Sequence, residues 1–260
     1  MTPLKLATKQ KTTPTHRVSV RIHLEDGLTT TVHVVRYDRS AYQTRLVVFE
    51  QATRLLDWCQ AEQFAEALVG GFFIRETGRM LGDHWQDGQP LSTHPIPEPW
   101  NQLRGSLHIT SDGQFTLGRR QQFPKQPVHS LLQAGPLLLQ NRQSLITDGK
   151  EQEGVSAASH QFDTDITLGR YPRAAIGSDN RYIWSVVCDG RSADEAGLTL
   201  TELTAVMQAL GAHDALNLDG GSSATQISQG VLRNQPRSDD TLFHAGRPVY
   251  SGLIFEPTAV

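Results

Sequence analysis

The sequence predicts an α+β fold, in one domain built around a mixed β-sheet. Short segments in which β-branched and polar residues alternate recur along the chain, as half-buried strands require. A strand, an amphipathic helix and a second strand then follow one another over residues 182–218. The chain has 260 residues, 38% hydrophobic and 20% charged, which is enough to bury one large core or two small ones. We expect the domain to span 16–260, after a disordered polar tail over 1–15.

The first half of the chain has the patterns of hairpins and one helix. Alternation over 16–35, interrupted at Gly27, predicts a hairpin, and 46–49 predicts a further strand. Apolar residues at helical spacing predict a helix over 55–68, ended by two glycines. Residues 90–99 read as a loop, 106–117 as a hairpin and 131–139 as a buried segment broken at its Gly-Pro pair.

The second half holds the clearest unit. Residues 174–177 and 182–188 predict two antiparallel strands, and a helix then begins after Thr199. Residues 215–218 form the next strand. In a strand–helix–strand unit the two strands run parallel in one sheet, so the residues after 188 and after 218 should meet at one sheet edge.

Composition excludes several classes of function. The formal net charge is −3, and no run of Lys and Arg is interleaved with aromatic residues, so nucleic acid is not an expected partner. Cys59 and Cys188 lie far apart in apolar segments, which indicates core thiols and not a zinc site. No apolar stretch approaches the ~20 residues that cross a bilayer. The N-terminus lacks a signal-peptide pattern. We therefore expect a cytoplasmic protein with no membrane partner, or a secreted or periplasmic one if a leader has been removed.

The most informative stretch is residues 215–226, where an apolar strand runs into Asp219 and then a Gly-Gly-Ser turn. A carboxylate beside backbone N–H groups combines an acid/base group or cation ligand with an anion-binding nest, formed here by Gly220, Gly221 and Ser222. The alternative is a tight turn that Asp219 merely caps.

Asp189 stands at the corresponding strand end and is also followed by glycine. Two carboxylates on one rim meet the basic requirement of glycoside hydrolysis. Arg191 could hold a phosphate through its planar fork, and Arg173, on the antiparallel neighbour, could reach the same rim. The alternative for each arginine, and above all for Arg173, is a solvated surface charge.

Thr199 and Glu202 form a capping-box pattern at the start of the predicted helix. This role is sufficient to explain both residues. The helix N-terminus nevertheless lies near the same sheet edge and favours an anion, so both remain candidates for the site.

At this point four stretches of the chain resemble the phosphodiester glycosidase family, in the expected order. They are Gly-Gly-Phe-Phe at 70–73, Arg-Ala-Ala-Ile-Gly at 173–177, Asp-Gly-Arg at 189–191 with Gly-Leu-Thr-Leu-Thr-Glu-Leu at 197–203, and Asn-Leu-Asp-Gly-Gly-Ser-Ser at 217–223. Arg-Pro-Val at 247–249 also looks like the family's Arg-x-Val before a closing strand. The likeness covers 65–255 loosely and 170–225 tightly. Val69 is a departure, since the family has asparagine before the two glycines.

The resemblance implies cleavage at the anomeric carbon of a sugar joined through phosphate to another group, so the partner is a small-molecule or glycan substrate that bears a sugar phosphate. Asp219 and Asp189 are then the acid/base candidates, with Glu202 in a second rank. The substrate-binding candidates are Arg173, Arg191, Thr199, Asn217, Gly70, Gly71, Gly220, Gly221 and Ser222.

Two other functions remain open from the sequence. One is a metal-assisted phosphodiesterase that cuts P–O, with the aspartates holding a divalent cation, Ca²⁺ or Mg²⁺. The other is a non-catalytic binder of phosphorylated glycans, which Val69 favours. No cofactor is certain, and the oligomeric state, the sugar and the stereochemistry are left open.

Overall fold

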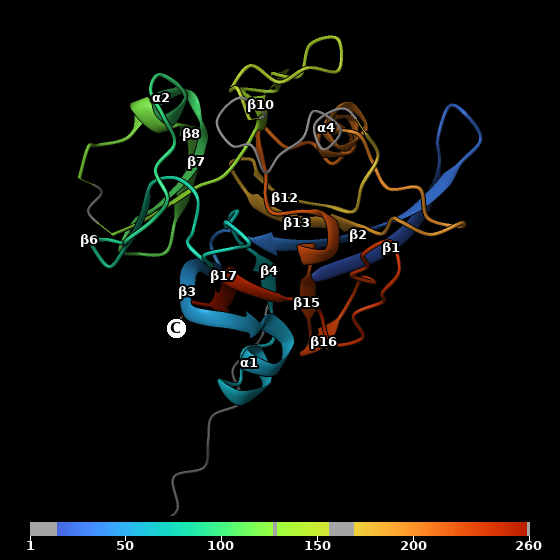
Figure 1. Cartoon of the computed structure of the whole chain (residues 1–260), viewed down its shortest axis with the longest axis horizontal. Helices are drawn as coiled ribbons and strands as arrows, with labels where there is room; N and C mark the ends of the chain where they lie inside the picture. Colours follow the sequence, from blue (N-terminus) through green and yellow to red (C-terminus); the bar gives the residue numbers. More distant parts are fainter. Residues whose placement is uncertain (1–14, 127–128, 156–168, 259–260) are drawn as a thin grey trace, which may run out of the picture.

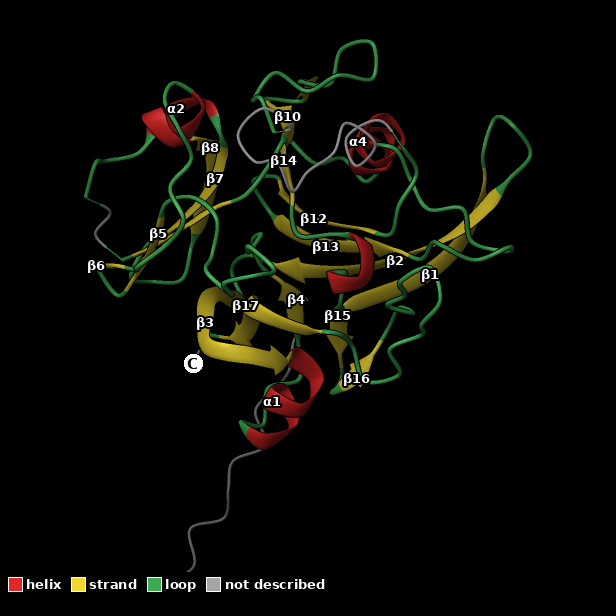
Figure 2. Ribbon diagram, viewed as in Figure 1, coloured by secondary structure: helices red, strands yellow, loops and turns green. Residues whose placement is uncertain are grey.

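Three antiparallel β-sheets make up most of the computed structural model, which describes residues 15–126, 129–155 and 169–258 (Figures 1 and 2). The tail expected over 1–15 therefore lies outside the described residues, apart from Thr15.

The largest sheet has seven strands in the order β1-β2-β13-β12-β14-β10-β11. Their bounds are β1 (His16–His23), β2 (Thr29–Asp38), β10 (Leu137–Gln140), β11 (Gln143–Ser144), β12 (Arg173–Ser178), β13 (Tyr182–Cys188) and β14 (Asp214–Asn217). The hairpin expected at the N-terminus is confirmed, since β1 and β2 pair over their full length across the Gly27 turn.

The second and third sheets have five strands each. The second runs β16 (Val231–Leu232), β15 (Gln226–Ser228), β4 (Ala67–Val69), β17 (Pro248–Pro257) and β3 (Tyr42–Arg54). The third runs β6 (Gln89–Pro90), β5 (His84–Gln86), β9 (Ser130–Gln133), β7 (Gly105–Ile109) and β8 (Phe115–Arg119). It contains the hairpin expected over 106–117, as β7 and β8.

The expectation of a mixed sheet is wrong, because every ladder between the described strands is antiparallel. β12 lies between β13 and β14 and pairs antiparallel with both. The two strands around the helix therefore run in the same direction without pairing with each other.

The described helices are short: α1 (Leu55–Ala61), α2 (Trp100–Leu103), α4 (Leu200–Ala209) and the 3₁₀ turns η1 (Arg120–Gln122) and η2 (Gly221–Ser223). α1 stops well before the glycines that were expected to end it. Leu68, which fits the helical spacing, lies instead in β4, where it pairs with β15 and β17 and is fully buried. Tertiary pairing thus overrides the local pattern.

Successive side chains along a strand of the large sheet point to opposite faces, and each face packs against a different hydrophobic core. Ala174, Ile176 and Leu216 face a core shared with the other two sheets. Ala175 and Ala215 face a smaller core. The smaller core lies under α4, which covers the outer face of the sheet (Figure 2). The central strands β13, β12 and β14 are therefore packed on both faces, which fixes the positions of the loops at their ends.

Among the residues that the structure describes, no helix has the length and apolar character needed to cross a membrane.

Candidate active site

A pocket that opens to solvent lies at the end of β14, beside η2, and its empty space, including the open mouth, is about 760 Å³. Its described lining consists of Phe72, Phe73, Arg75, Gly135, Pro136, Val155, Tyr171, Arg173, Arg191, Leu200, Asn217, Leu218, Asp219, Gly220, Gly221, Ser222, Ser223 and Arg247. These residues come from all parts of the chain after position 70, so the pocket exists only in the folded protein.

Asp219 reaches this pocket from the end of β14. The backbone N–H of Leu218 donates to Ala174 in β12 at 2.9 Å, and that of Asp219 donates to the carbonyl of Gly70 at 3.0 Å. Leu218 is fully buried in the core. The buried leucine and the two backbone bonds hold the Asp219 carboxyl at the pocket wall.

Burial raises the pKa of Asp219 to about 7. A hydrogen bond from Ser223, the charge of Arg247 and the N–H of Gly220 oppose this rise and do not cancel it. A carboxyl whose pKa lies near neutrality can exchange a proton with substrate at the working pH, which is what general acid–base catalysis requires.

The turn after Asp219 does not present the open row of N–H groups that the sequence predicts. The N–H of Gly221 donates to the Pro172 carbonyl at 2.7 Å, and that of Ser223 donates to the Gly220 carbonyl at 3.1 Å. The positive φ of Gly221, 57°, is what lets the chain close into η2. Gly220, Gly221 and Ser222 do line the pocket, but most of the turn's N–H groups are used to build it.

The groups that could bind an anion in this pocket are arginine side chains and not the backbone N–H groups of the turn. Arg173 and Arg191 both lie near the ring of Tyr171, with their guanidinium carbons 5.5 and 5.3 Å from its centroid. Arg173 is 4% exposed, and this burial lowers its pKa to about 10, so it still carries its proton at neutral pH. Its Nε and Nη2 donate to the carbonyls of Leu198 and Gly169, each at 2.9 Å.

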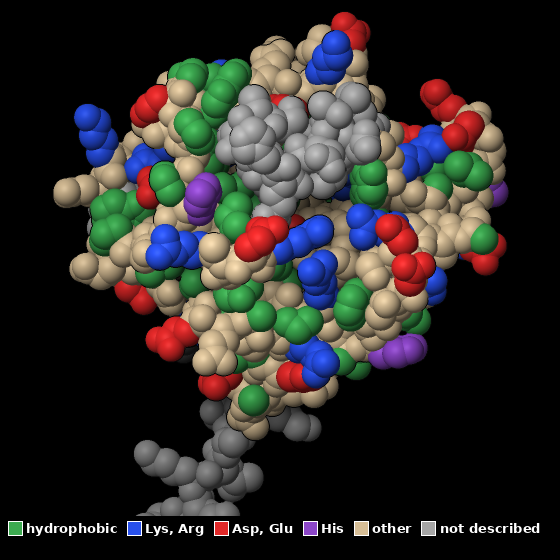
Figure 3. All heavy atoms as spheres, in the orientation of Figure 1, with side chains coloured by type: hydrophobic (Ala, Val, Ile, Leu, Met, Phe, Trp, Pro, Cys, Tyr) green, Lys and Arg blue, Asp and Glu red, His purple; other side chains and the backbone are tan. Residues whose placement is uncertain are grey.

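Arg75 and Arg247 complete the cationic lining. Arg247 donates through Nη1 to the hydroxyl of Ser222. Burial lowers the pKa of Arg247, and the charge of Arg75 lowers it further. In Figure 3, blue side chains gather in the middle of the face where Figure 2 draws η2. In the described lining, the four guanidinium groups and the Asp219 carboxyl make a site for an anionic ligand.

Asn217 joins the pocket to the Gly135-Pro136 turn. Its Nδ2 donates to the carbonyls of Gly135 and Leu218 at 3.0 Å each. Its Oδ1 is buried and has no hydrogen-bond partner in the described structure. That oxygen is an acceptor held beside the pocket, suited to a hydroxyl group of a ligand.

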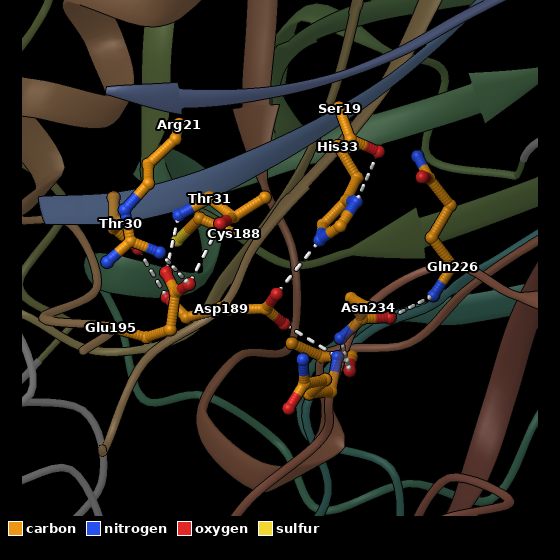
Figure 4. Close-up of polar contacts among 12 residues, drawn as sticks. Ser19, Arg21, Thr30, Thr31, His33, Cys188, Asp189, Glu195, Gln226 and Asn234 are labelled. Atoms are coloured by element: carbon orange, nitrogen blue, oxygen red, sulfur yellow. Dashed lines mark hydrogen bonds and ion pairs between the residues drawn. The ribbon is translucent and has the colours of Figure 1, made fainter. Parts of the chain in front are cut away.

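Asp189 does not line the pocket with Asp219, contrary to the sequence-based expectation. It is 3% exposed, and its carboxylate is turned toward β2, where Oδ2 lies 2.9 Å from Nε2 of His33 (Figure 4). Its Oδ1 accepts from the N–H of Gln235 at 2.6 Å. The two carboxylates share a sheet edge but face different neighbours, because β12 separates their strands.

Glu202 and Thr199 also lie outside the pocket lining. The structure contains the full capping box, in which Glu202 N–H donates to Thr199 Oγ1 at 3.1 Å and Thr199 N–H donates to Glu202 Oε2 at 2.8 Å. Arg170 donates to the same carboxylate at 2.6 Å. Burial alone would raise the pKa of Glu202, but the bonds from Arg170 and Thr199 outweigh it and lower this pKa. The geometry favours a structural role for both residues.

Gly70 and Gly71 do not line the pocket, and Gly70 supports the site through the hydrogen bond that its carbonyl accepts from Asp219 N–H. A Cβ on Gly70 would stand 2.3 Å from Oγ of Ser251, and one on Gly71 would stand 2.8 Å from Cδ1 of Leu132. Val69, the departure from the family pattern, is fully buried in the large core. This stretch requires glycine for close packing, and position 69 points into the core.

The sequence profile of the phosphodiester glycosidase family matches residues 63–256, about three quarters of the chain. The chain belongs to the phosphodiester glycosidase family. Within that family it is 26% identical, over 196 residues, to the mouse N-acetylglucosamine-1-phosphodiester alpha-N-acetylglucosaminidase. The match covers 72% of this chain and 37% of the mouse protein, so the chain spans about a third of that relative's length.

Solved structures share the fold of this phosphodiester glycosidase domain. One is the zebrafish N-acetylglucosamine-1-phosphodiester alpha-N-acetylglucosaminidase catalytic domain, auto-inhibited by its pro-peptide. Its TM-score is 0.71 at 18% identity, over 96% of this chain and 86% of that one. A hypothetical protein from Synechocystis superposes with a TM-score of 0.60 at 17% identity, over 94% of this chain and 64% of that one.

Several pocket residues of this family member were not predicted from the sequence. Phe72, Phe73 and Arg247 stand in stretches that carry the family resemblance, and that resemblance was the available signal. Arg75 and Tyr171 stand in stretches without a motif, and only the fold brings them to the pocket.

The metal-binding arrangement expected for the rival phosphodiesterase does not fit these residues. It needs Asp189 and Asp219 in one site, and they face different neighbours. Among the described residues, no three His, Cys, Asp or Glu side chains come together as metal ligands. The pocket presents guanidinium groups, which repel a cation.

Proposed function

We propose that this protein hydrolyses the glycosidic bond of a sugar-1-phosphodiester, releasing free sugar and a phosphomonoester. The observation that supports this best is the carboxyl of Asp219, with its pKa near 7, in a pocket whose described lining includes four arginines. The arginines suit the phosphate, and the carboxyl suits the proton transfer that hydrolysis needs.

In the proposed reaction the oxygen of a water molecule forms a bond to the anomeric carbon, and a proton of that water passes to Asp219. The bond from the anomeric carbon to the phosphate oxygen breaks, and its electron pair stays on that oxygen. A phosphomonoester is a good leaving group, so it needs no proton from a second carboxylic acid. The guanidinium groups stabilise the charge that develops on it.

For the substrate we propose an N-acetylglucosamine-1-phosphodiester or a close analogue, since that is the substrate named for the mouse and zebrafish relatives. The hydroxyl groups of the sugar would face Asn217, whose Oδ1 has no hydrogen-bond partner in the described structure. The phosphate would lie between Arg191 and Arg247.

The test is hydrolysis of a sugar-1-phosphodiester in ¹⁸O-labelled water. Cleavage of the C–O bond puts the label in the sugar, and cleavage of the P–O bond puts it in the phosphate. The Asp219→Asn variant keeps the shape of the side chain and should lose at least about 10²-fold in kcat. Label in the phosphate would support the rival phosphodiesterase. Binding without turnover, unchanged in Asp219→Asn, would support a non-catalytic binder.

A further inference from the structure

Asp189 is buried, belongs to a family motif and yet does not reach the pocket. Its carboxylate is used on both oxygens: Oδ2 lies 2.9 Å from Nε2 of His33, and Oδ1 accepts from Gln235 N–H at 2.6 Å. The other ring nitrogen of His33 lies 2.8 Å from Oγ of Ser19 (Figure 4). Because both oxygens of this buried carboxylate have partners, Asp189 holds His33 and the backbone of Gln235 in place.

The segment that Asp189 holds is also tied to the turn after Asp219. Asn234, the neighbour of Gln235, donates through Nδ2 to the carbonyl of Ala224 at 2.8 Å and accepts from Gln226 N–H at 3.0 Å. Ala224 directly follows η2. Residues 234–235 therefore bridge the end of β13 and the end of η2.

Arg191 also lies close to the turn after Asp219. It follows Asp189 by two residues and has a φ of 61°, in the left-handed region that non-glycine residues rarely adopt. Its guanidinium carbon and nitrogens lie 3.6 to 3.7 Å from where a Cβ of Gly221 would stand. The Asp189 backbone is anchored by its N–H to Thr31 at 3.0 Å and by its carbonyl to the Thr30 hydroxyl at 2.8 Å. These two hydrogen bonds hold the start of the turn that carries Arg191 in place.

We infer that Asp189 is a positioning residue for phosphate recognition: through Gln235 and Asn234 it fixes the distance between the Arg191 guanidinium and η2. This inference rests on the proposed function. It assigns Asp189 an effect on the affinity for the phosphate group and no part in the transfer of the proton.

The test compares three variants in steady-state hydrolysis of a sugar-1-phosphodiester and in calorimetric binding of inorganic phosphate. Asp189→Ala removes the acceptor for Gln235 and should raise KM and the Kd for phosphate about tenfold, with kcat changed less than about threefold. Asp189→Asn keeps an oxygen for the Gln235 N–H and should recover most of that affinity. Asn234→Ala breaks the other end of the bridge and should reproduce the KM effect, so the inference stays testable if Asp189→Ala fails to fold.

Glu195→Gln is the matched control. Glu195 accepts from Thr31 N–H at 2.5 Å and from Thr31 Oγ1 at 2.8 Å, so it supports the same sheet edge without touching the bridge. It should lower thermal stability and leave KM and the phosphate Kd unchanged. A similar rise of KM in Glu195→Gln, or a large loss of kcat in Asp189→Asn at unchanged KM, would overturn the inference.

Phosphate binding separates this inference from the proposed function. If the wild-type protein hydrolyses no sugar-1-phosphodiester, yet loses phosphate affinity in Asp189→Ala and Asn234→Ala only, the proposed function fails and the positioning role stands. If wild type turns over and neither variant changes KM or Kd, the positioning role fails alone. A wild-type protein that neither binds phosphate nor turns over contradicts both.

Discussion

The backbone N–H of Asp219 donates a 3.0 Å hydrogen bond to the carbonyl oxygen of Gly70. This bond joins two motif stretches about 150 positions apart in the sequence and helps to fix the position of the Asp219 carboxyl in the pocket wall. The glycine pair and the catalytic candidate therefore act as one unit, in which the first supports the second.

The pH dependence of activity should report Asp219. If it accepts the proton of water, only the ionised form is active, so kcat/KM should rise about tenfold per pH unit below pH 7 and level off above it, given the pKa of about 7. The phosphodiester stays singly charged over this range and adds no titration. A profile that falls through pH 7 would instead make Asp219 a general acid.

Stability should follow the opposite course. The pKa of Asp219 is raised from 3.8, so the folded state holds the proton more tightly than the unfolded state does. The folded protein should lose stability as pH rises from about 4 to about 7 and lose no more from this group above that. Urea titrations of wild type and Asp219→Asn would show this in the difference between their unfolding free energies, because the raised pKa of Glu153 acts in both proteins and cancels.

Arg191→Lys should raise KM for the phosphodiester about tenfold and leave kcat within a few-fold. Lysine keeps the charge and loses the planar fork that matches phosphate, and its ammonium cannot stack on Tyr171 in the same way. Arg21→Lys is the control, because Arg21 pairs with Glu195 outside the pocket lining. Equal KM values in wild type and Arg191→Lys would show that Arg191 does not bind phosphate.

Glu202→Gln should keep nearly full kcat. Glutamine can still complete the capping box, and what it loses is the partly exposed ion pair with Arg170, worth less than about 1 kcal/mol. Thermal unfolding and turnover of the same sample would test this. A large loss of activity at unchanged melting temperature would return Glu202 to the catalytic candidates.

Val69→Asn should destabilise the protein by about 2 kcal/mol or more and improve hydrolysis of no substrate, because it places an amide in a fully buried apolar position. Val69→Ala would measure the lost packing alone, and the difference between the two gives the cost of the amide. Raised activity in Val69→Asn would mean that position 69 communicates with the site.

The sequence predicts the local pairings and the helix cap well. The hairpins at 16–35 and 106–117, the α4 cap and the Asp219 turn all depend on neighbours within a few residues. Residues 65–68 continue a helical spacing, yet Ala67 and Leu68 lie in β4, because long-range pairing with β15 and β17 decides their conformation.

Contacts between residues far apart in the sequence also decide which side chains line the pocket, and local patterns do not predict them. Asp189 and Asp219 look equivalent in the sequence, since each ends a strand and precedes glycine. Which way each carboxyl turns depends on what packs beside it: His33 and residue 235 for the first, Ser223 and Arg247 for the second. Arg75 and Tyr171 have no local signal, because their role exists only through contacts across the fold.

The placement of β12 between β13 and β14 also sets a length scale for the ligand. Adjacent strands lie about 4.8 Å apart, so the loops that follow β13 and β14 start roughly 10 Å from each other. A hexose with a phosphate on its anomeric carbon spans a similar length, and a single inorganic phosphate does not. Under the proposed function, the width of β12 would therefore separate the loop after β13, which carries Arg191 for the phosphate, from the loop after β14, which carries Asp219 for the anomeric carbon.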